Sequence, residues 1–276
     1  MISAPLKQCK IMGVLNVTPD SFFDRGLYLD LDKAIQQGEQ LIEEGAELID
    51  IGGESSRPGS KSVALDVELK RVVPVLKKLI KRFPKIQYSI DTQKSEVAHS
   101  ALSEGARIIN DVSSLRNDPK MISVIKKFNP ILILMHMQGS PFNMQKFPFY
   151  KNVVKEIKDF LKERIKWAMQ NGVPKTNLWI DPGIGFGKNL KHNLEILKNL
   201  KDFLSLKCPL VLGCSRKSFI GFILGGKESP CPPEERLEGS LAAAAWGYLE
   251  GASILRVHDV LETKRTIRVL QAIQAK

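Results

Sequence analysis

The sequence predicts an α/β fold, a single (β/α)8 TIM barrel with long loops after strands 1 and 2. Short apolar runs of strand length recur about eight times along the 276 residues, and the segments between them show the 3.6-residue period of helices. The phrase Glu-Gly-Ala, followed by an apolar run, begins at Glu44, Glu104 and Glu250. Because left-handed glycine ends a helix at little steric cost, this phrase predicts a helix end followed by a buried strand.

The expected strands are short apolar runs, and those that follow the Glu-Gly-Ala phrases have the composition of strands buried on both faces, as in a parallel sheet covered by helices. In chain order, the strands are expected at 10–16, 48–52, 87–91, 108–111, 131–136, 178–181, 210–213 and 254–258. Between them, helical periodicity is clear at 34–42, 72–80, 153–165 and 194–200. A doubly wound open sheet is the alternative, since it is built from the same local units.

Two connections are longer than simple turns. Residues 17–29 and 53–63 are rich in Gly, Pro, Ser, Asp and Arg, and both follow expected strands. Loops at the carboxyl ends of the strands build the active site of such barrels. No segment resembles an interdomain linker, so we expect one domain over residues 1–276.

The composition narrows the classes of partner. There are 41 Lys and Arg against 30 Asp and Glu, a formal charge of +11, which is a feature of nucleic-acid-binding proteins. The basic residues are scattered over helix faces without interleaved aromatics, so we expect no nucleic-acid partner. No apolar run approaches the length of a membrane span, and the four cysteines form no CxxC pair. We therefore expect no membrane partner and a cytoplasmic location.

The expected strand ends carry many polar side chains, which a barrel brings to one face. The acceptors Asp91, Asn110 and Asp181 suit an amidine-like heterocycle edge, as in a guanine or a pterin. Basic side chains suit an anion, because the last two loops of such barrels often bind phosphate. These basic residues are Arg57, Arg216, Lys217, Arg256 and His258. The mouth of the barrel is therefore expected to bind a planar heterocycle and an anion.

Eight motifs along the chain carry a family resemblance. They are LNVTPDSF at 15–22, DIGGESSRPG at 50–59, IDT at 90–92, INDV at 109–112, MHMQG at 135–139, DPGIGFGK at 181–188, SRKS at 215–218 and RVHD at 256–259. Together, and in this order, they resemble the dihydropteroate synthases of folate biosynthesis. The resemblance implies the transferase reaction that condenses 6-hydroxymethyl-7,8-dihydropterin pyrophosphate with p-aminobenzoate. It also implies a Mg²⁺ cofactor, a homodimer and a target of sulfonamides.

The resemblance assigns roles residue by residue. The pterin would be held by Asp91, Asn110, Met135, Asp181 and Lys217, and the pyrophosphate by Asn16, Ser56, Arg256 and His258. Asn16 would also meet Mg²⁺. The p-aminobenzoate would lie among Arg57, Pro58, Phe186, Lys217 and Ser218. Asp91, Lys217 and Arg57 are the expected catalytic residues.

Several neighbouring residues have structural interpretations. Glu54 is expected to orient its loop, and Asp111 and Asp259 to cap a helix or pair with an arginine. His136 either contacts a ligand directly or supports the site through hydrogen bonds. Cys214 is expected to be a small buried residue at a strand end and not a nucleophile.

The alternative function is a pterin-dependent methyltransferase, which shares the barrel and the acidic positions. The motifs SRKS and RVHD disfavour it, since methyl transfer leaves no pyrophosphate to bind.

Overall fold

The computed structural model describes residues 9–18 and 27–275. Its strands are β1 (Lys10–Asn16), β2 (Leu48–Gly52), β3 (Gln87–Asp91), β4 (Ile108–Asp111), β5 (Ile131–Met135), β6 (Leu178–Asp181), β7 (Val211–Leu212) and β8 (Ile254–Val257). Its α-helices are α1 (Leu27–Glu43), α2 (Leu65–Arg82), α3 (Ser95–Ser103), α4 (Met121–Phe128), α5 (Val153–Gln170), α6 (Leu190–Lys198), α7 (Ser218–Gly225), α8 (Leu237–Leu249) and α9 (Val260–Gln274). Short 3₁₀ helices are η2 (Lys175–Asn177), η3 (Leu200–Leu206) and η4 (Pro233–Glu235). Most of the expected first loop, residues 19–26, lies outside the described residues.

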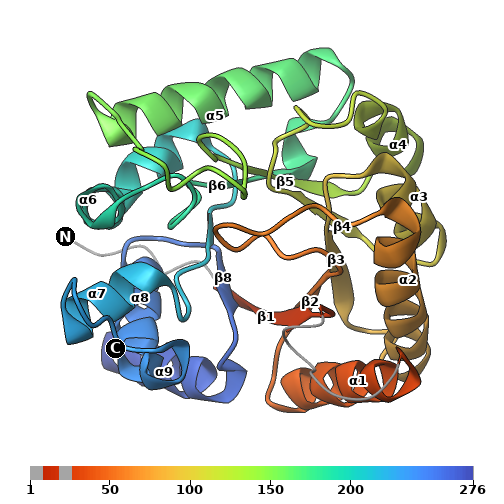
Figure 1. Cartoon of the computed structure of the whole chain (residues 1–276), viewed down its shortest axis with the longest axis horizontal. Helices are drawn as coiled ribbons and strands as arrows, with labels where there is room; N and C mark the ends of the chain where they lie inside the picture. Colours follow the sequence, from red (N-terminus) through yellow and green to blue (C-terminus); the bar gives the residue numbers. More distant parts are fainter. Residues whose placement is uncertain (1–8, 19–26, 276) are drawn as a thin grey trace.

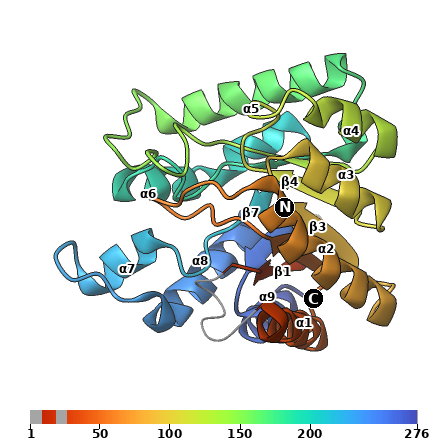
Figure 2. The ribbon, with the colours of Figure 1, turned by 45° about the vertical axis from the view of Figure 1, so that its right-hand side comes forward.

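The strands form one parallel sheet in the order β6-β5-β4-β3-β2-β1-β8-β7. Its two edges meet through an isolated bridge between Ile180 and Leu210, where the Ile180 N–H donates to the Pro209 carbonyl at 3.0 Å. Helices surround the strands in both ribbon views (Figures 1 and 2). The predicted (β/α)8 barrel is therefore confirmed, and the open-sheet alternative is wrong.

Three strands end earlier than the sequence predicted. β5 ends at Met135 and β8 at Val257, each one residue short, and the ladder of β7 contains only Val211 and Leu212. Pro209 limits β7, because proline has no N–H to donate to a neighbouring strand. The connection from β7 to β8 also holds two helices, α7 and α8, where the sequence predicted simple alternation.

The Glu-Gly-Ala phrases end helices as predicted. Their glycines, Gly45, Gly105 and Gly251, have φ values of 103°, 112° and 94°. In each phrase the chain leaves a helix through this left-handed residue and enters the next strand directly. This local geometry explains why the three connections are so short.

An apolar layer closes the lower part of the barrel. One buried cluster takes a residue from each of seven strands: Met12, Leu48, Ile108, Ile133, Trp179, Val211 and Ile254. Residues from so many neighbouring strands meet only inside a barrel, so this cluster is its floor. A larger cluster joins the outer faces of the strands to the helices. None of the described helices has the length and apolar character needed to cross a membrane.

Candidate active site

A polar layer lies directly above the apolar floor. Side chains two residues apart on a strand point to the same face, so the residue two positions beyond each floor residue also points inward. Five of these positions are Asp50, Asn110, Asp181, Gly213 and Arg256. On β2, β4, β6 and β8 the barrel therefore changes from apolar to polar within one step along the strand, whereas the equivalent residues of β1, β5 and β7 are Val14, Met135 and Gly213.

Asp50 is at the centre of this layer, and sequence reasoning missed it. Its side chain is fully buried, and Oδ2 accepts from Asn110 Nδ2 at 3.0 Å and from Arg256 Nε at 2.6 Å. Arg256 also donates from an Nη to Asp91 Oδ2 at 3.1 Å. A carboxylate within the apolar run of β2 is the signal that points to it, because buried charges need partners. Asp50 thus joins β2, β4 and β8 inside the barrel.

This network fixes how Asn110 faces the mouth. Asp50 Oδ2, which also pairs with Arg256, accepts from the Asn110 NH₂ group, so Asn110 is left with its amide oxygen as the acceptor that can meet a ligand. Asp91 lies beside Asn110 in the β3–β4 register. Burial raises the pKa of Asp91 to about 7, although Arg256 opposes the shift. The two residues present acceptors to a ligand that donates.

Asp181 and Lys217 form the opposite wall. Burial raises the pKa of Asp181, and Lys217 is the charge that most opposes this shift. Burial in turn lowers the pKa of Lys217 to about 8. Lys217 Nζ lies 4.6 Å from the ring centroid of Phe186 and donates to the Ile184 carbonyl. A cation at this position contacts an aromatic ring and faces a carboxylate.

Gly213 leaves open space between the basic side chains. A Cβ built there would lie 3.8 Å from Arg256 Cβ and 3.9 Å from Lys217 Nζ. Both side chains therefore flank the same short gap in the barrel wall. Met135 completes this side of the mouth in a buried apolar cluster against which Phe186 packs.

The end of β8 carries a neutral histidine. Burial, reinforced by Arg256 and Arg216, lowers the pKa of His258 to about 3. Its Nδ1 lies 3.1 Å from Ser215 Oγ, which also accepts from the His258 N–H at 3.2 Å. His258 can therefore offer an anion a hydrogen bond but no charge.

Arg216 differs from the expectation that it would surround an anion. Its guanidinium forms an ion pair with Asp259, so its charge is already neutralised. Asp259 thus pairs with an arginine, as one of its two interpretations predicted. Asp111 caps the turn after β4 by accepting from the Ser113 and Leu115 N–H groups, each at 2.8 Å.

The β2–α2 loop, residues 53–64, passes over the mouth of the barrel (Figure 1). Glu54 anchors its base by accepting from Ser62 Oγ at 2.9 Å, the Val63 N–H at 2.8 Å and Lys94 Nζ at 2.6 Å. At the tip, the Gly59 N–H donates to the Pro141 carbonyl at 2.9 Å. Glu54 therefore orients its loop, as predicted.

The ligand candidates on this loop are more open to solvent than those of the strands. Arg57 and Pro58 are exposed, and Ser56 is half-buried. The charge of Arg57 contributes to the lowered pKa of His258, so the two groups are within electrostatic reach of each other. Ser218 is also exposed, at the first residue of α7, where helix N–H groups are free to bind an anion.

Two residues near the mouth, His136 and Cys214, lie in surroundings that suit a structural role. Burial, reinforced by the charges of Lys188 and Arg116, lowers the pKa of His136 to about 2, and its ring packs edge-on against Phe160. Its Nδ1 contacts Lys188, so His136 supports the site through hydrogen bonds. Burial raises the pKa of Cys214 to about 12, which keeps it a thiol and not a nucleophilic thiolate.

The donor set at the mouth suits a weakly held divalent cation. Within the described residues no cluster of three His, Cys, Asp or Glu side chains could hold a metal. Asn16 ends β1 opposite Gly52, and a Cβ on Gly52 would lie 3.7 Å from Asn16 Oδ1 and 3.6 Å from Asp91 Cβ. Mg²⁺ commonly takes one or two protein oxygens and completes its shell with phosphate and water. The residues present therefore fit Mg²⁺ that arrives with a phosphorylated ligand.

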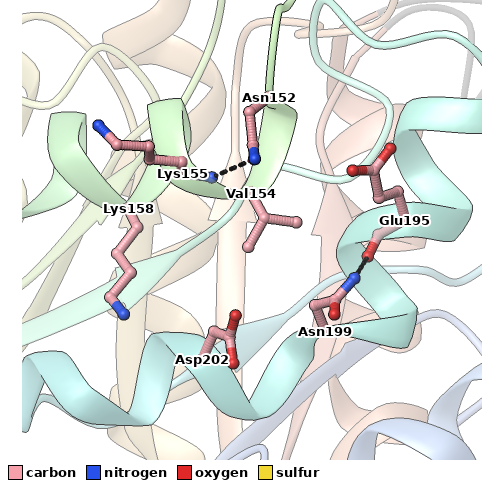
Figure 3. A pocket seen from close by; sticks show the side chains of 7 residues that line it. All are labelled: Asn152, Val154, Lys155, Lys158, Glu195, Asn199 and Asp202. Atoms are coloured by element: carbon pink, nitrogen blue, oxygen red, sulfur yellow. Dashed lines mark hydrogen bonds between the residues drawn. The ribbon is translucent and has the colours of Figure 1, made fainter.

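Three cavities lie away from the acceptors at the strand ends. One of about 270 Å³ lies between α5, α6 and η3, among Lys155, Lys158, Glu195 and Asp202 (Figure 3). Another of about 310 Å³ lies beside the mouth, between the β2–α2 loop and residues 137–142. A third, of about 550 Å³, lies between α2 and α3. None of the three is lined by the acceptors of the strand ends, so the site is identified by its chemistry and not by the size of a cavity.

Comparisons with known proteins agree with this chemistry. The pterin binding enzyme family matches residues 12–258. Dihydropteroate synthase of Escherichia coli (strain K12) is 43% identical over 270 residues, which cover 98% of this chain and 93% of the relative. A crystal structure of dihydropteroate synthase from Yersinia pestis, with a sulfonamide drug complex, is 42% identical and superposes with a TM-score of 0.91 over 98% of this chain and 95% of that one.

A further solved relative contains a bound pteroate. Dihydropteroate synthase from Xanthomonas albilineans in complex with 7,8-dihydropteroate is 39% identical, with a TM-score of 0.86 over 98% of this chain and 95% of that one. The barrel, the polar layer and these likenesses lead to the same assignment. The chain belongs to the pterin binding enzyme family and, within it, to the dihydropteroate synthases.

Proposed function

We propose that this transferase condenses 6-hydroxymethyl-7,8-dihydropterin pyrophosphate with p-aminobenzoate to give 7,8-dihydropteroate and pyrophosphate. The observation that carries the proposal is the polar layer, where buried acceptors and basic side chains share one mouth. Acceptors suit the amino and N–H groups of a pterin, and the basic groups suit its pyrophosphate. Close relatives carry out this activity by name, and one was solved with 7,8-dihydropteroate.

The proposed pterin site consists of Asp91, Asn110, Met135, Asp181 and Lys217. Three of them accept or exchange hydrogen bonds with the ring edge, Met135 provides an apolar face, and Lys217 balances the charge of Asp181. The Asp50 network supports this arrangement because it holds the Asn110 amide in the accepting orientation.

The proposed pyrophosphate site consists of Asn16, Ser56, Arg256 and His258. Asn16 is the proposed Mg²⁺ ligand, and the bound ion would supply positive charge to the departing pyrophosphate. Arg256, whose charge is shared with Asp50 and Asp91, is proposed to donate hydrogen bonds at the same place, and the neutral His258 supplies another. The exposed side chains of Arg57, Pro58 and Ser218, with Phe186 and Lys217, form the proposed p-aminobenzoate site.

The reaction breaks the bond between the pterin methylene carbon and a pyrophosphate oxygen, and the oxygen keeps the electron pair. Positive charge then develops on the methylene carbon beside the ring. We propose that Asp91, as a carboxylate, stabilises this charge, while Lys217 and Arg57 orient the second substrate. The aromatic amine forms the new carbon–nitrogen bond and loses one proton to solvent.

A pterin-dependent methyltransferase is not favoured. Methyl transfer from a pterin needs the heterocycle site but no anion site, and Arg256, Lys217 and His258 border one mouth here. The close relatives named for the condensation reaction point the same way.

The test of the proposed function is a turnover assay. Purified protein is incubated with the pterin pyrophosphate, Mg²⁺ and p-aminobenzoate, and pyrophosphate release is followed together with pteroate formation. We expect both products in equal amounts, with neither formed when p-aminobenzoate is omitted. Pyrophosphate release that does not depend on p-aminobenzoate would show a hydrolase and contradict the proposal.

Arg57 and Ser56 are adjacent, yet we expect their loss to affect different substrates. Arg57→Ala should mainly raise the KM for p-aminobenzoate and weaken competitive inhibition by a sulfonamide. Ser56→Ala should weaken binding of the pterin pyrophosphate by about 0.5–1.5 kcal/mol, the contribution of one hydroxyl hydrogen bond. Steady-state kinetics with each substrate varied separately measures both effects. If both variants raised only the pterin term, Arg57 would not belong to the p-aminobenzoate site.

The value of kcat/KM for the pterin pyrophosphate should be highest between about pH 7 and pH 8. Asp91 must be ionised to stabilise a cation, and its pKa is about 7, so kcat/KM for the pterin pyrophosphate should fall as the pH falls through 7. Lys217 must be protonated to bind the pterin pyrophosphate as a cation, and its pKa is about 8. The value of kcat/KM for this substrate should therefore also fall as the pH rises through 8. A pH–rate profile checks both limbs. Asp91→Asn, which has no carboxyl group to titrate, should lack the acidic limb.

We propose further that the chain is one cytoplasmic domain that forms a homodimer through its last helices. Four free cysteines support a reducing compartment. Exposed apolar side chains on α7, α8 and α9 support the dimer, among them Ile223, Leu224, Trp246 and Ile273. Leu224→Asp should therefore yield monomers in sedimentation velocity. Phe142→Asp, at an exposed apolar residue elsewhere, is the control and should leave the dimer intact.

A further inference from the structure

A buried lysine in the loop after β6 takes no part in the proposed reaction. The side chain of Lys188 is 2% exposed. Its Nζ lies 2.9 Å from the Phe186 carbonyl oxygen, 3.0 Å from His136 Nδ1 and 3.4 Å from the His136 carbonyl oxygen. Among the described residues no carboxylate lies within ion-pairing distance of this nitrogen. Its partners are therefore two backbone carbonyls and an imidazole, from two separate segments.

These three contacts satisfy Lys188 in both of its protonation states. Burial, reinforced by the charge of Lys217, lowers its pKa. An ammonium group has three N–H donors for the three acceptors. A neutral amine donates to the two carbonyls and accepts from a protonated Nδ1 of His136. Lys188 therefore links the end of β5 to the Phe186 loop whatever its charge.

The segments that Lys188 joins are packed without spare space. Gly183 has a φ of 69°, and a Cβ built on it would lie 1.9 Å from the His136 carbonyl oxygen. A Cβ on Gly187 would lie 2.6 Å from the Gln138 carbonyl oxygen. Only glycine permits this close approach of the two backbones. Between these contacts, the Phe186 carbonyl is held by the Lys188 amino group.

We propose that Lys188 is a positioning residue for the second substrate: it fixes the backbone of Phe186 against the end of β5 and so holds the Phe186 ring at the p-aminobenzoate site. The ring is in place beside Lys217 Nζ, at 4.6 Å from its centroid. The inference rests on the proposed function of that site. It adds a residue that itself touches no substrate.

The pterin end of the same loop has support of its own. Asp181 belongs to the β5–β6 ladder, in register with Met135, and its Oδ1 accepts from the Gly183 N–H at 2.7 Å. Loss of the Lys188 contacts leaves this support in place. The effect is therefore expected on p-aminobenzoate and not on the pterin.

The test is Lys188→Met, which keeps the length of the side chain and removes every donor. We expect the KM for p-aminobenzoate to rise by about tenfold or more, since a displaced wall misplaces the attacking amine. The KM for the pterin pyrophosphate should stay within about twofold of the parent value, a split that a general loss of structure would not produce. Calorimetric titration with a pterin alone confirms that the variant retains its fold and its first site.

Two further variants keep the proposal decidable. Lys188→Gln retains an N–H donor and should recover part of the lost affinity for p-aminobenzoate; it replaces the methionine variant if that protein does not fold. Tyr150→Phe is the matched control, because it removes the bond of 2.9 Å from the Tyr150 hydroxyl to the Gly187 carbonyl and leaves Phe186 untouched. It should not change the KM for p-aminobenzoate.

Equal changes in both KM values, or no change, would overturn the role of Lys188 while the parent enzyme remained active. Inactivity of the parent enzyme would overturn the proposed function itself.

Discussion

Asp181→Ala should weaken pterin binding by about 1–3 kcal/mol for each hydrogen bond that is left unmade. The side chain is buried at the end of β6, where water cannot easily replace a lost acceptor. Lys217 would also lose the negative charge that most raises its pKa. Calorimetric titration with a pterin measures the loss directly.

Asp181→Asn separates the shape of this side chain from its acceptor capacity. Asparagine keeps the volume and replaces one acceptor oxygen by a donor, so it should bind the pterin nearly as poorly as alanine does. Unchanged pterin affinity in either folded variant would contradict the assignment of Asp181 to the heterocycle.

Asp50→Ala should reduce the free energy of unfolding by about 3–5 kcal/mol, the usual cost of removing one partner of a buried ion pair. Arg256 Nε and Asn110 Nδ2 would both lose their acceptor. Pterin affinity should fall as well, because the Asn110 amide would be free to turn. Urea unfolding followed by circular dichroism measures the stability.

Asp259→Ala is the matched control for this experiment. It removes the Asp of another Arg–Asp pair, with Arg216, whose arginine side chain is 40% exposed, so it should cost no more than about 1 kcal/mol. If Asp50→Ala were no more destabilising than Asp259→Ala, the buried network would not be the structural centre of the site.

The sequence was sufficient to predict the barrel because its local signals agree with the global fold. The Glu-Gly-Ala phrases predicted three helix ends, and the polar residues after the apolar runs predicted where the strands end. The sequence predicted a strand at 210–213 but did not show that the ladder of β7 would contain only Val211 and Leu212. An apolar run looks the same whether it forms a ladder or an isolated bridge, and only the absence of an N–H at Pro209 pointed to weaker pairing.

Only the site residues at or near the strand ends could be predicted from the sequence. Asp181 was found because it ends β6 and Asn110 because it lies next to the end of β4, whereas Asp50 lies inside an apolar run and was passed over. The two-residue period of the strands would have identified it, as it points to the same face as the strand-end residue Gly52. Lys188 was beyond reach, because no pattern in a glycine-rich loop indicates that its lysine turns inward.

The seam between β6 and β7 has a consequence for how the barrel stays shut. Every other pair of neighbouring strands shares a ladder, but these two share one isolated bridge. Asp181 follows directly on one side of the seam, and Lys217 lies beyond the strand on the other side. A pterin bound by both residues would connect β6 to the segment after β7, where backbone hydrogen bonding between neighbouring strands is weakest. Ligand binding at the mouth and local opening of the barrel between β6 and β7 are then linked equilibria. The bound substrate should therefore make this local opening less frequent.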